Sequence, residues 1–315
     1  MNSEWQFAFG VDANYVKYAG IMMTSIVLNH PGQPVCFHLA CDGLTDEDKA
    51  KLDQFTLLYR NTKIVIYDAA KILETLPLPP AVAPERLNRS VFLRILLPSF
   101  LPQELTKVVY LDADMLCIGQ LDDLWQTETD SQAVTACLDP THEKNAKRLG
   151  LTHTRYFNAG ALVINLPVWR QEKITQQVLD CYRTQGSRFV LLEQDALNVT
   201  LDGRFKELPA RFNRQLSAFN PLLIKREPDD VILHFVNEGK PWIKGCVPEI
   251  QELYWSYVRR SLWFDMQPTE PWDVQTAYLA GKNAEGRGDY KEACHYLDIA
   301  AYRLLEFYLE QTGQK

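Results

Sequence analysis

Two aspartates spaced two residues apart, Asp112 and Asp114, are the strongest candidates for chemistry in this sequence. They follow the apolar run Lys107–Leu111, which predicts a buried strand. Because side chains alternate along an extended chain, both carboxylates fall on one face and Ala113 points away. Neighbouring carboxylates repel each other, and a divalent cation offsets that repulsion. The pattern alone leaves two interpretations open, an Mn²⁺ or Mg²⁺ site and a solvated acidic turn.

Other residues with useful chemistry stand at the ends of predicted strands or the starts of predicted helices, where α/β proteins bind ligands. A histidine at a strand end can complete a carboxylate metal site, and a nearby lysine can neutralise phosphate. An arginine within an apolar helix needs an anionic partner, either an internal carboxylate or a bound anion. The residues concerned are Asp12, Asn14 and Tyr15, Arg94, Asn158, Ala159 and Gly160, Glu193, Gln194 and Asp195, and His234 and Lys240.

Each of these groups also has a structural interpretation. An acidic residue at a helix N-terminus is usually a cap, which would account for Glu193–Asp195. A lone histidine such as His234 is more often an ordinary partner of the backbone. The triplet Asn158–Gly160 carries no bulk, so it allows close approach of the backbone to another group. None of these groups identifies a function alone.

The predicted elements that position these residues alternate between strand and helix. Strands are expected over 5–11, 35–41 and 63–67, and a helix over 44–59 begins at a capping box that starts with Thr45. This alternation predicts an α/β fold with a mainly parallel, doubly wound sheet. Neither a Gly-x-Gly-x-x-Gly motif nor a P-loop is present in the sequence, which argues against a dinucleotide fold of the usual kind and against a P-loop nucleotidase.

Composition limits the function classes further. The net charge of −7 provides no global attraction to nucleic acid, so no nucleic-acid partner is expected. The seven cysteines are scattered without a Cys-x-x-Cys pair, which favours reduced thiols and a cytoplasmic protein. The sequence begins without a recognisable secretory signal, and no apolar run reaches the length of a membrane span.

The C-terminal part differs in composition from the rest. We expect a catalytic region at 1–248 and a helical extension at 249–315, with helices near 272–285 and 290–310. The stretch Tyr254–Phe264 mixes aromatic residues with two arginines. It could anchor the protein peripherally at the inner face of the cytoplasmic membrane, or pack the extension on the main domain.

Taken together, these motifs resemble glycosyltransferase family 8, which contains glycogenin and the bacterial α-galactosyl- and α-glucosyltransferases of lipopolysaccharide core synthesis. The resemblance runs from about Phe7 to Trp242. It implies a single Rossmann-like domain of the GT-A type that binds a nucleotide-diphosphate sugar on a mainly parallel mixed sheet, plus the C-terminal helical extension.

The resemblance also implies residue roles. Asp112, Asp114 and His234 would hold Mn²⁺, or Mg²⁺, against the diphosphate of a UDP-sugar donor. Tyr15 would stack on the uracil, and Lys240 would contact phosphate. The remaining donor-binding residues would be Gly10, Asp12, Asn14, Arg94, Ala113, Asn158, Ala159 and Gly160, with Glu193, Gln194 and Asp195 as the catalytic candidates.

The implied function is a retaining transferase that moves glucose or galactose from UDP to a lipopolysaccharide-core-type oligosaccharide or glycolipid. Alternatives are another acceptor, namely a protein glycan, a cell-wall polymer or the protein itself, and a nucleotide-sugar-binding protein without turnover. The sequence departs from the family pattern twice. Asn237 stands where a glycine usually follows the histidine by three residues, and Glu193 stands where many members have aspartate.

Overall fold

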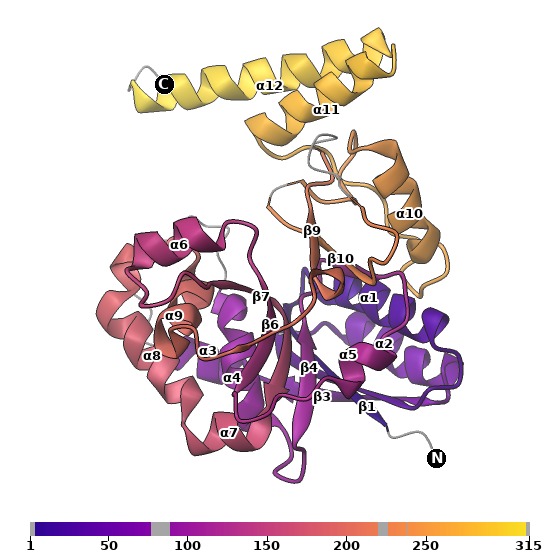
Figure 1. Cartoon of the computed structure of the whole chain (residues 1–315). Helices are drawn as coiled ribbons and strands as arrows, with labels where there is room; N and C mark the ends of the chain where they lie inside the picture. The colour runs from indigo at the N-terminus through magenta and orange to yellow at the C-terminus, as the bar shows by residue number, and fades with distance from the viewer. Residues whose placement is uncertain (1–3, 77–88, 220–225, 238, 313–315) are drawn as a thin grey trace. The chain divides into compact units, whose positions relative to one another are not determined.

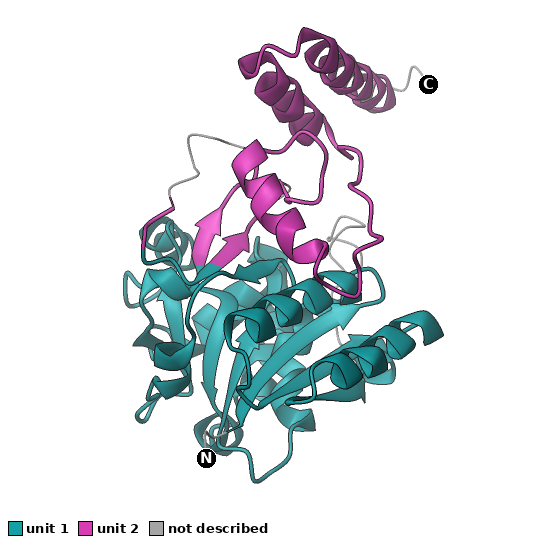
Figure 2. Ribbon diagram, turned by 90° about the vertical axis from the view of Figure 1, so that its right-hand side faces the viewer, with its two compact units in different colours: residues 1–213, 229–232 teal, residues 214–228, 233–315 magenta. Residues whose placement is uncertain are grey.

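The computed structural model describes residues 4–76, 89–219, 226–237 and 239–312 (Figure 1). The chain forms two compact units, coloured separately in Figure 2. Unit 1 comprises residues 1–213 and 229–232, and unit 2 comprises residues 214–228 and 233–315. The two units do not divide at residue 248, where we expected the catalytic region to end. That boundary describes a functional region and not a compact unit, and it stays a prediction.

Unit 1 is built on a seven-stranded sheet with the strand order β3-β2-β1-β4-β7-β6-β8. Neighbours pair in parallel from β3 through β4 and again between β6 and β8, whereas β7 pairs antiparallel with both β4 and β6. The predicted α/β fold with a mainly parallel mixed sheet is confirmed. The strands are β1 (Trp5–Asp12), β2 (Val35–Asp42), β3 (Thr62–Asp68), β4 (Lys107–Leu111), β6 (Val134–Leu138), β7 (Phe157–Asn165) and β8 (Lys206–Glu207), with the short β5 (Met115–Cys117) following β4.

Helices flank the sheet of unit 1 (Figure 1). They are α1 (Val16–Asn29), α2 (Asp46–Leu58), α3 (Ala70–Thr75), α4 (Leu93–Phe100), α5 (Asp122–Gln126), α6 (His142–Leu149), α7 (Leu166–Gln171), α8 (Ile174–Gln185) and α9 (Leu192–Leu201), with short 3₁₀ segments at Arg89–Phe92, Gly186–Arg188 and Ala210–Phe212. A large core joins buried residues of β4, β6 and β7 to α4, α8 and α9. This core fixes the helix ends that carry the candidate site.

The local sequence explains where several elements begin and end. Helix α2 begins at the predicted capping box, in which Thr45 and Asp48 exchange hydrogen bonds between side chain and backbone. Pro167 is a residue type typical of the first position of a helix, and the sequence predicts one helix from Pro167 to about Gln185. That prediction is wrong, because the structure has two helices, α7 and α8. Lys173 adopts a left-handed conformation with φ of 54° between them, and that conformation ends a right-handed helix.

Unit 2 contains β9 (Arg214–Leu216) and all of β10 (Ile232–Phe235) except its first residue, and these two strands pair in parallel. They are followed by α10 (Pro248–Val258), α11 (Val274–Gly286) and α12 (Tyr290–Gln311). Helices α11 and α12 form the expected hairpin, and Gly288 in the turn has φ of 79°. The predicted helical C-terminal extension is therefore present.

The aromatic stretch 254–264 is mostly interior. Tyr254, Tyr257 and Trp263 are buried, and Phe264 is exposed. Arg259 pairs with Glu252 on the same helix. Within the described residues, no helix is long and apolar enough to cross a membrane. All seven cysteines are free thiols. A proline-rich segment after Leu76, which the sequence suggests as a lid or a stiff connection, lies outside the described residues.

Candidate active site

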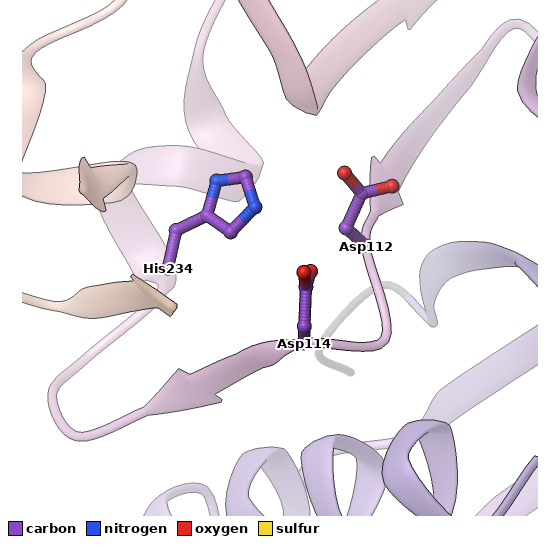
Figure 3. A group of neighbouring side chains, drawn as sticks. All are labelled: Asp112, Asp114 and His234. Atoms are coloured by element: carbon purple, nitrogen blue, oxygen red, sulfur yellow. The ribbon is translucent and has the colours of Figure 1, made fainter. Parts of the chain in front are cut away.

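The three predicted metal ligands, Asp112, Asp114 and His234, lie close together (Figure 3). Each offers one ligand atom, and these atoms all lie within 4.8 Å of one another. The aspartates stand between β4 and β5, and His234 belongs to β10. Two carboxylate oxygens and an imidazole nitrogen form a donor set that suits Mn²⁺ or Mg²⁺. The residues present therefore fit a divalent cation.

A cavity of about 250 Å³ adjoins the two aspartates. The ends of β1 and β4 and the segment before α4 supply its walls, so it opens where parallel strands end, as ligand sites in α/β folds do. Several predicted donor-binding and catalytic residues are not among its described lining residues, namely Asn14, Asn158, Ala159, Gly160, Glu193, Gln194, Asp195 and Lys240. The lining consists of Gly10, Val11, Asp12, Tyr15, Ser90, Val91, Arg94, Tyr110, Asp112, Ala113 and Asp114.

Arg94 is the cation of this cavity, and its anionic partners are internal carboxylates. Its Nη2 lies 2.9 Å from Asp112 Oδ1, and its Nε lies 3.3 Å from Glu193 Oε1. The guanidinium also lies over the ring of Tyr110, whose hydroxyl donates to Asp112. Burial alone would lower the pKa of Arg94, but the charges of Asp112 and Glu193 hold it above its ordinary value. Arg94 therefore stays charged and links α4 to the turn that carries Asp112 and Asp114.

Glu193 is a buried carboxylate in the first turn of α9. Burial raises the pKa of Glu193 to about 7, although the charge of Arg94 opposes that rise. Desolvation therefore outweighs a single ion pair at this position. Near neutral pH the group can hold or release a proton.

The end of β1 forms a tight polar turn. Oδ1 of Asp12 accepts hydrogen bonds from the backbone N–H groups of Asn14 at 2.8 Å and Tyr15 at 3.0 Å. Such a turn directs the chain into α1 and leaves the Tyr15 side chain 38% exposed at the cavity. Tyr15 thus offers an accessible ring edge or face to a ligand.

Gly10 is required for packing in this region. A Cβ atom added at Gly10 would lie 2.6 Å from Cβ of Leu93, the residue before Arg94. No real Cβ tolerates that distance, so β1 and the start of α4 can approach this closely only because residue 10 is glycine. The glycine sets the separation between the strand and the helix that carries Arg94.

The segment Asn158–Gly160 lies within β7 and is bonded to α9. Oδ1 of Asn158 accepts from the N–H of Gly160 and from Nδ2 of Asn213, and the N–H of Ala159 donates to Oε1 of Gln194 at 2.9 Å. The carbonyl of Gly160 accepts from the N–H of Asp112 at 2.8 Å. This small-residue segment therefore joins the turn that carries Asp112 and Asp114 to the start of α9.

Asp195 is enclosed by a hydrogen-bond network whose other two main members the sequence did not reveal. Arg148 makes a bidentate pair with its carboxylate, at 2.8 Å for each bond, and Tyr156 donates to it at 2.7 Å. Tyr156 in turn accepts from Nε2 of Gln194 at 3.0 Å. Arg148 lies 47 residues before Asp195, so no local pattern predicts the pair. Tyr156 stands two residues before the predicted site residue Asn158, and this nearness is the only indication in the sequence that Tyr156 lies close to the site.

A family model described as "Glycosyl transferase family 8" matches residues 6–246, which is most of the chain. The chain belongs to glycosyl transferase family 8.

Relatives and solved structures agree with this family. The chain is 25% identical to a lipopolysaccharide 1,3-galactosyltransferase of Salmonella typhimurium, over 93% of this chain and 89% of that protein. It is 27% identical to a lipopolysaccharide 1,2-glucosyltransferase of Escherichia coli K12, over 84% and 80%. The crystal structure of galactosyltransferase LgtC with donor and acceptor sugar analogs superposes with a TM-score of 0.70 at 21% identity, covering 82% of this chain and 96% of that one. This last likeness concerns the fold.

The family-8 pattern gives meaning to two residues after His234. Asn237, which replaces the usual glycine, has φ of 61°, a left-handed conformation. Asparagine adopts that conformation more readily than most residues other than glycine, so the backbone turn survives the replacement. Lys240 is buried, and its Nζ donates to the carbonyl of Phe235. The lysine is thereby held close to the strand that carries His234.

Proposed function

We propose that this family-8 protein is a UDP-hexose-dependent, retaining α-glycosyltransferase that adds glucose or galactose to a lipopolysaccharide-core-type oligosaccharide. The observation that carries the proposal is the Asp112, Asp114 and His234 donor set beside a cavity that Asp12, Tyr15 and Arg94 also line. Carboxylates that gather without enough fixed cations fit a metal-bound diphosphate better than a free anion.

In the proposed reaction the glycosidic bond between the sugar and the diphosphate breaks, and negative charge develops on the departing UDP. Mn²⁺ or Mg²⁺ bound to Asp112, Asp114 and His234 would stabilise that charge electrostatically. Lys240 would contact a phosphate oxygen, and Tyr15 would stack on the uracil. Arg94 holds Asp112 in place with a bond that does not depend on the ligand.

Glu193, Gln194, Asn158, Ala159 and Gly160 would surround the donor sugar. Their mutual bonds support this assignment, since the N–H of Ala159 fixes the Gln194 amide. Glu193 is longer by one methylene than the aspartate common in the family, so its carboxylate is the group most suited to distinguish one hexose from another.

Retention of configuration would follow a front-face route, in which the leaving phosphate guides the acceptor hydroxyl. A double displacement needs a free carboxylate on the opposite face of the sugar. Asp195 is fully buried with both oxygens bonded, and Glu193 is paired with Arg94. An amide such as that of Gln194 is a poor nucleophile.

The acceptor assignment rests on the relatives named above. Both are lipopolysaccharide hexosyltransferases, one for galactose and one for glucose. Their names support a lipopolysaccharide-type acceptor, and their different sugars leave both UDP-glucose and UDP-galactose as candidate donors. Peripheral contact with a membrane-bound acceptor stays a prediction, for which the exposed ring of Phe264 is the remaining aromatic candidate.

A donor panel tests the proposal directly. The protein is incubated with Mn²⁺ and either UDP-glucose or UDP-galactose, with and without truncated lipopolysaccharide core, and UDP release is measured. We expect slow hydrolysis of one donor, faster release with the acceptor, and an α-linked product by NMR. Release that increases only with a protein or cell-wall acceptor would reassign the substrate. UDP binding without any turnover would make the protein a binding module.

A further inference from the structure

The Asp195 cluster comprises Arg148, Tyr156, Gln194 and Asp195, and its hydrogen bonds leave little freedom to its central carboxylate. Five donors engage Asp195: two from Arg148, one from Tyr156, and the backbone N–H groups of Val190 and Leu191. Its side chain is fully buried. A carboxylate held in this way is a fixed acceptor, not a reactive group.

The cluster also stabilises an uncommon turn. Leu192, the first residue of α9, has φ of 42°, a left-handed conformation that side chains disfavour. The two N–H groups just before it donate to Oδ2 of Asp195, so they are not left unbonded at the helix start. Asp195 therefore fixes the backbone that presents Glu193 and Gln194.

The chemistry of the groups determines which one donates and which one accepts in each hydrogen bond of the cluster. Arginine can only donate and an ionised carboxylate can only accept, so the Tyr156 hydroxyl must donate to Asp195. The Tyr156 oxygen is then left to accept, and Nε2 of Gln194 donates to it. At the other end, the N–H of Ala159 can only donate, so the atom facing it must be Oε1 of Gln194.

The two ends thus specify the same orientation for the Gln194 amide. One hydrogen of Nε2 and one lone pair of Oε1 take part in these bonds. Within the described residues, no other hydrogen bond engages the amide group, so its second hydrogen and second lone pair can meet a ligand. Tyr156 and the N–H of Ala159 fix the orientation of the amide, and this orientation determines whether a ligand faces its hydrogen or its lone pair.

We infer that Tyr156 is a positioning residue of the sugar transfer: held by the Arg148–Asp195 pair, it fixes the orientation in which Gln194 presents its amide to the donor sugar. This inference rests on the proposed function, in which Gln194 lies beside that sugar. Tyr156 acts only through Gln194.

The test variant is Tyr156→Phe, which removes the hydroxyl and keeps the buried ring. Asp195 retains Arg148 and both backbone donors, so the fold should persist, as a thermal melt would verify. We expect kcat to fall about tenfold or more, since a small misplacement of a reacting group is costly, while KM for the donor stays within about twofold. The affinity for UDP with Mn²⁺, measured by calorimetry, should not change because UDP lacks the hexose that Gln194 would contact.

Tyr67→Phe is the matched control. Tyr67→Phe removes the same hydroxyl group and with it the hydrogen bond to Nδ1 of His38 at 2.9 Å, on a strand that supplies no residue to the cavity lining, whereas Tyr156→Phe removes two hydrogen bonds. We expect kcat of Tyr67→Phe to equal that of the wild type. An equal fall of kcat in both variants would mean that the loss of any buried hydrogen bond lowers kcat, and it would overturn the inference.

A double-mutant cycle separates positioning from a direct or structural role. If Tyr156 acts through Gln194, Tyr156→Phe should not lower kcat further in a Gln194→Ala background. The same fold-loss in both backgrounds overturns the inference, and so does an unchanged kcat in Tyr156→Phe. In those cases the wild type is still active. A wild type that turns over no UDP-sugar refutes the proposed function, and this inference falls with it.

Discussion

Glu193 and Asp195 stand two residues apart in the first turns of α9, and both are buried, yet their electrostatics are opposite. Burial raises the pKa of Glu193 to about 7. Burial also pushes the pKa of Asp195 upwards, but the bonds from Arg148, Tyr156 and the backbone bring it below its ordinary value. One carboxylate has a single cationic partner, and the other has five hydrogen-bond donors.

The comparison indicates that hydrogen-bond donors, together with burial, determine the direction in which the pKa of a buried carboxylate moves. A carboxylate with few donors remains available for protonation or for a ligand, whereas a fully bonded one becomes part of the scaffold. The candidate site contains both kinds of carboxylate on one helix. The cluster of Arg94, Asp112 and Glu193 is open to chemistry, and the Asp195 cluster holds it in place. Four changes test this distinction.

Replacing Arg94 and replacing Arg148 should lower the free energy of unfolding by unequal amounts. Arg94→Met leaves Asp112 and Glu193 without their cation, and we expect the free energy of unfolding of the metal-free protein to fall by about 3–5 kcal/mol. Arg148→Met leaves Asp195 with three donors, so its cost should be about 1–3 kcal/mol. Urea denaturation with EDTA present measures both, and equal costs would contradict the comparison.

Asp112→Asn and Asp114→Asn test whether the open cluster serves a ligand. Each removes one anionic donor from the candidate metal site, and we expect transfer activity to fall roughly a hundredfold, which is the effect of losing one strong electrostatic contact in a transition state. EDTA should abolish the wild-type activity. Asp53→Asn, on the exposed face of α2, is the control and should be fully active. Full activity of either site variant would remove the metal assignment.

The pH dependence of stability should differ between the two carboxylates. Because the pKa of Glu193 is raised from 4.5 to about 7, the native state keeps a proton that the unfolded chain releases, and stability falls as pH rises through that interval. The expected contribution is about 2 kcal/mol between about pH 5 and about pH 7, and Glu193→Gln should remove it. For Asp195, whose pKa is lowered, stabilisation is present above the ordinary value and is lost as pH falls. Denaturation of wild type and Glu193→Gln across this range decides the point.

Glu193→Asp should have the smallest effect on stability. The carboxylate retracts by one methylene, and Arg94 keeps its bond to Asp112, so we expect a change within about 1 kcal/mol. The ratio of kcat/KM for UDP-glucose and UDP-galactose should change more than either KM alone. An unchanged ratio would mean that Glu193 does not distinguish glucose from galactose.

The sequence predicted the parts of this molecule that depend on local pattern. Apolar runs located β1 to β4, the Thr45 capping box located α2, and the Asp112–Asp114 spacing located two neighbouring carboxylates of the candidate metal site. The break at Lys173 was missed, because nothing in its neighbourhood forbids a continuous helix and packing of α7 and α8 decides it.

The sequence did not predict which residues pair with the buried charged side chains. Arg94 clearly needed an anion, but the sequence left open whether that anion was internal or bound, and the structure supplies Asp112 and Glu193. Arg148 in the last turn of α6 reads as an ordinary surface cation until the fold brings it to Asp195. Such pairs depend on tertiary contacts between distant segments, which single-sequence patterns do not encode.

Gly10 has a consequence for how mutational scans of this protein are interpreted. Any side chain at this position collides with Leu93, so every substitution would displace the start of α4 and, with it, Arg94. Loss of function at residue 10 would therefore look like loss of a nucleotide contact even if no atom of Gly10 touched the nucleotide. A scan that pairs activity with protein abundance, and that includes Leu93→Gly together with Gly10→Ala as a compensating pair, separates the two causes, because glycine at position 93 removes the Cβ atom that would clash.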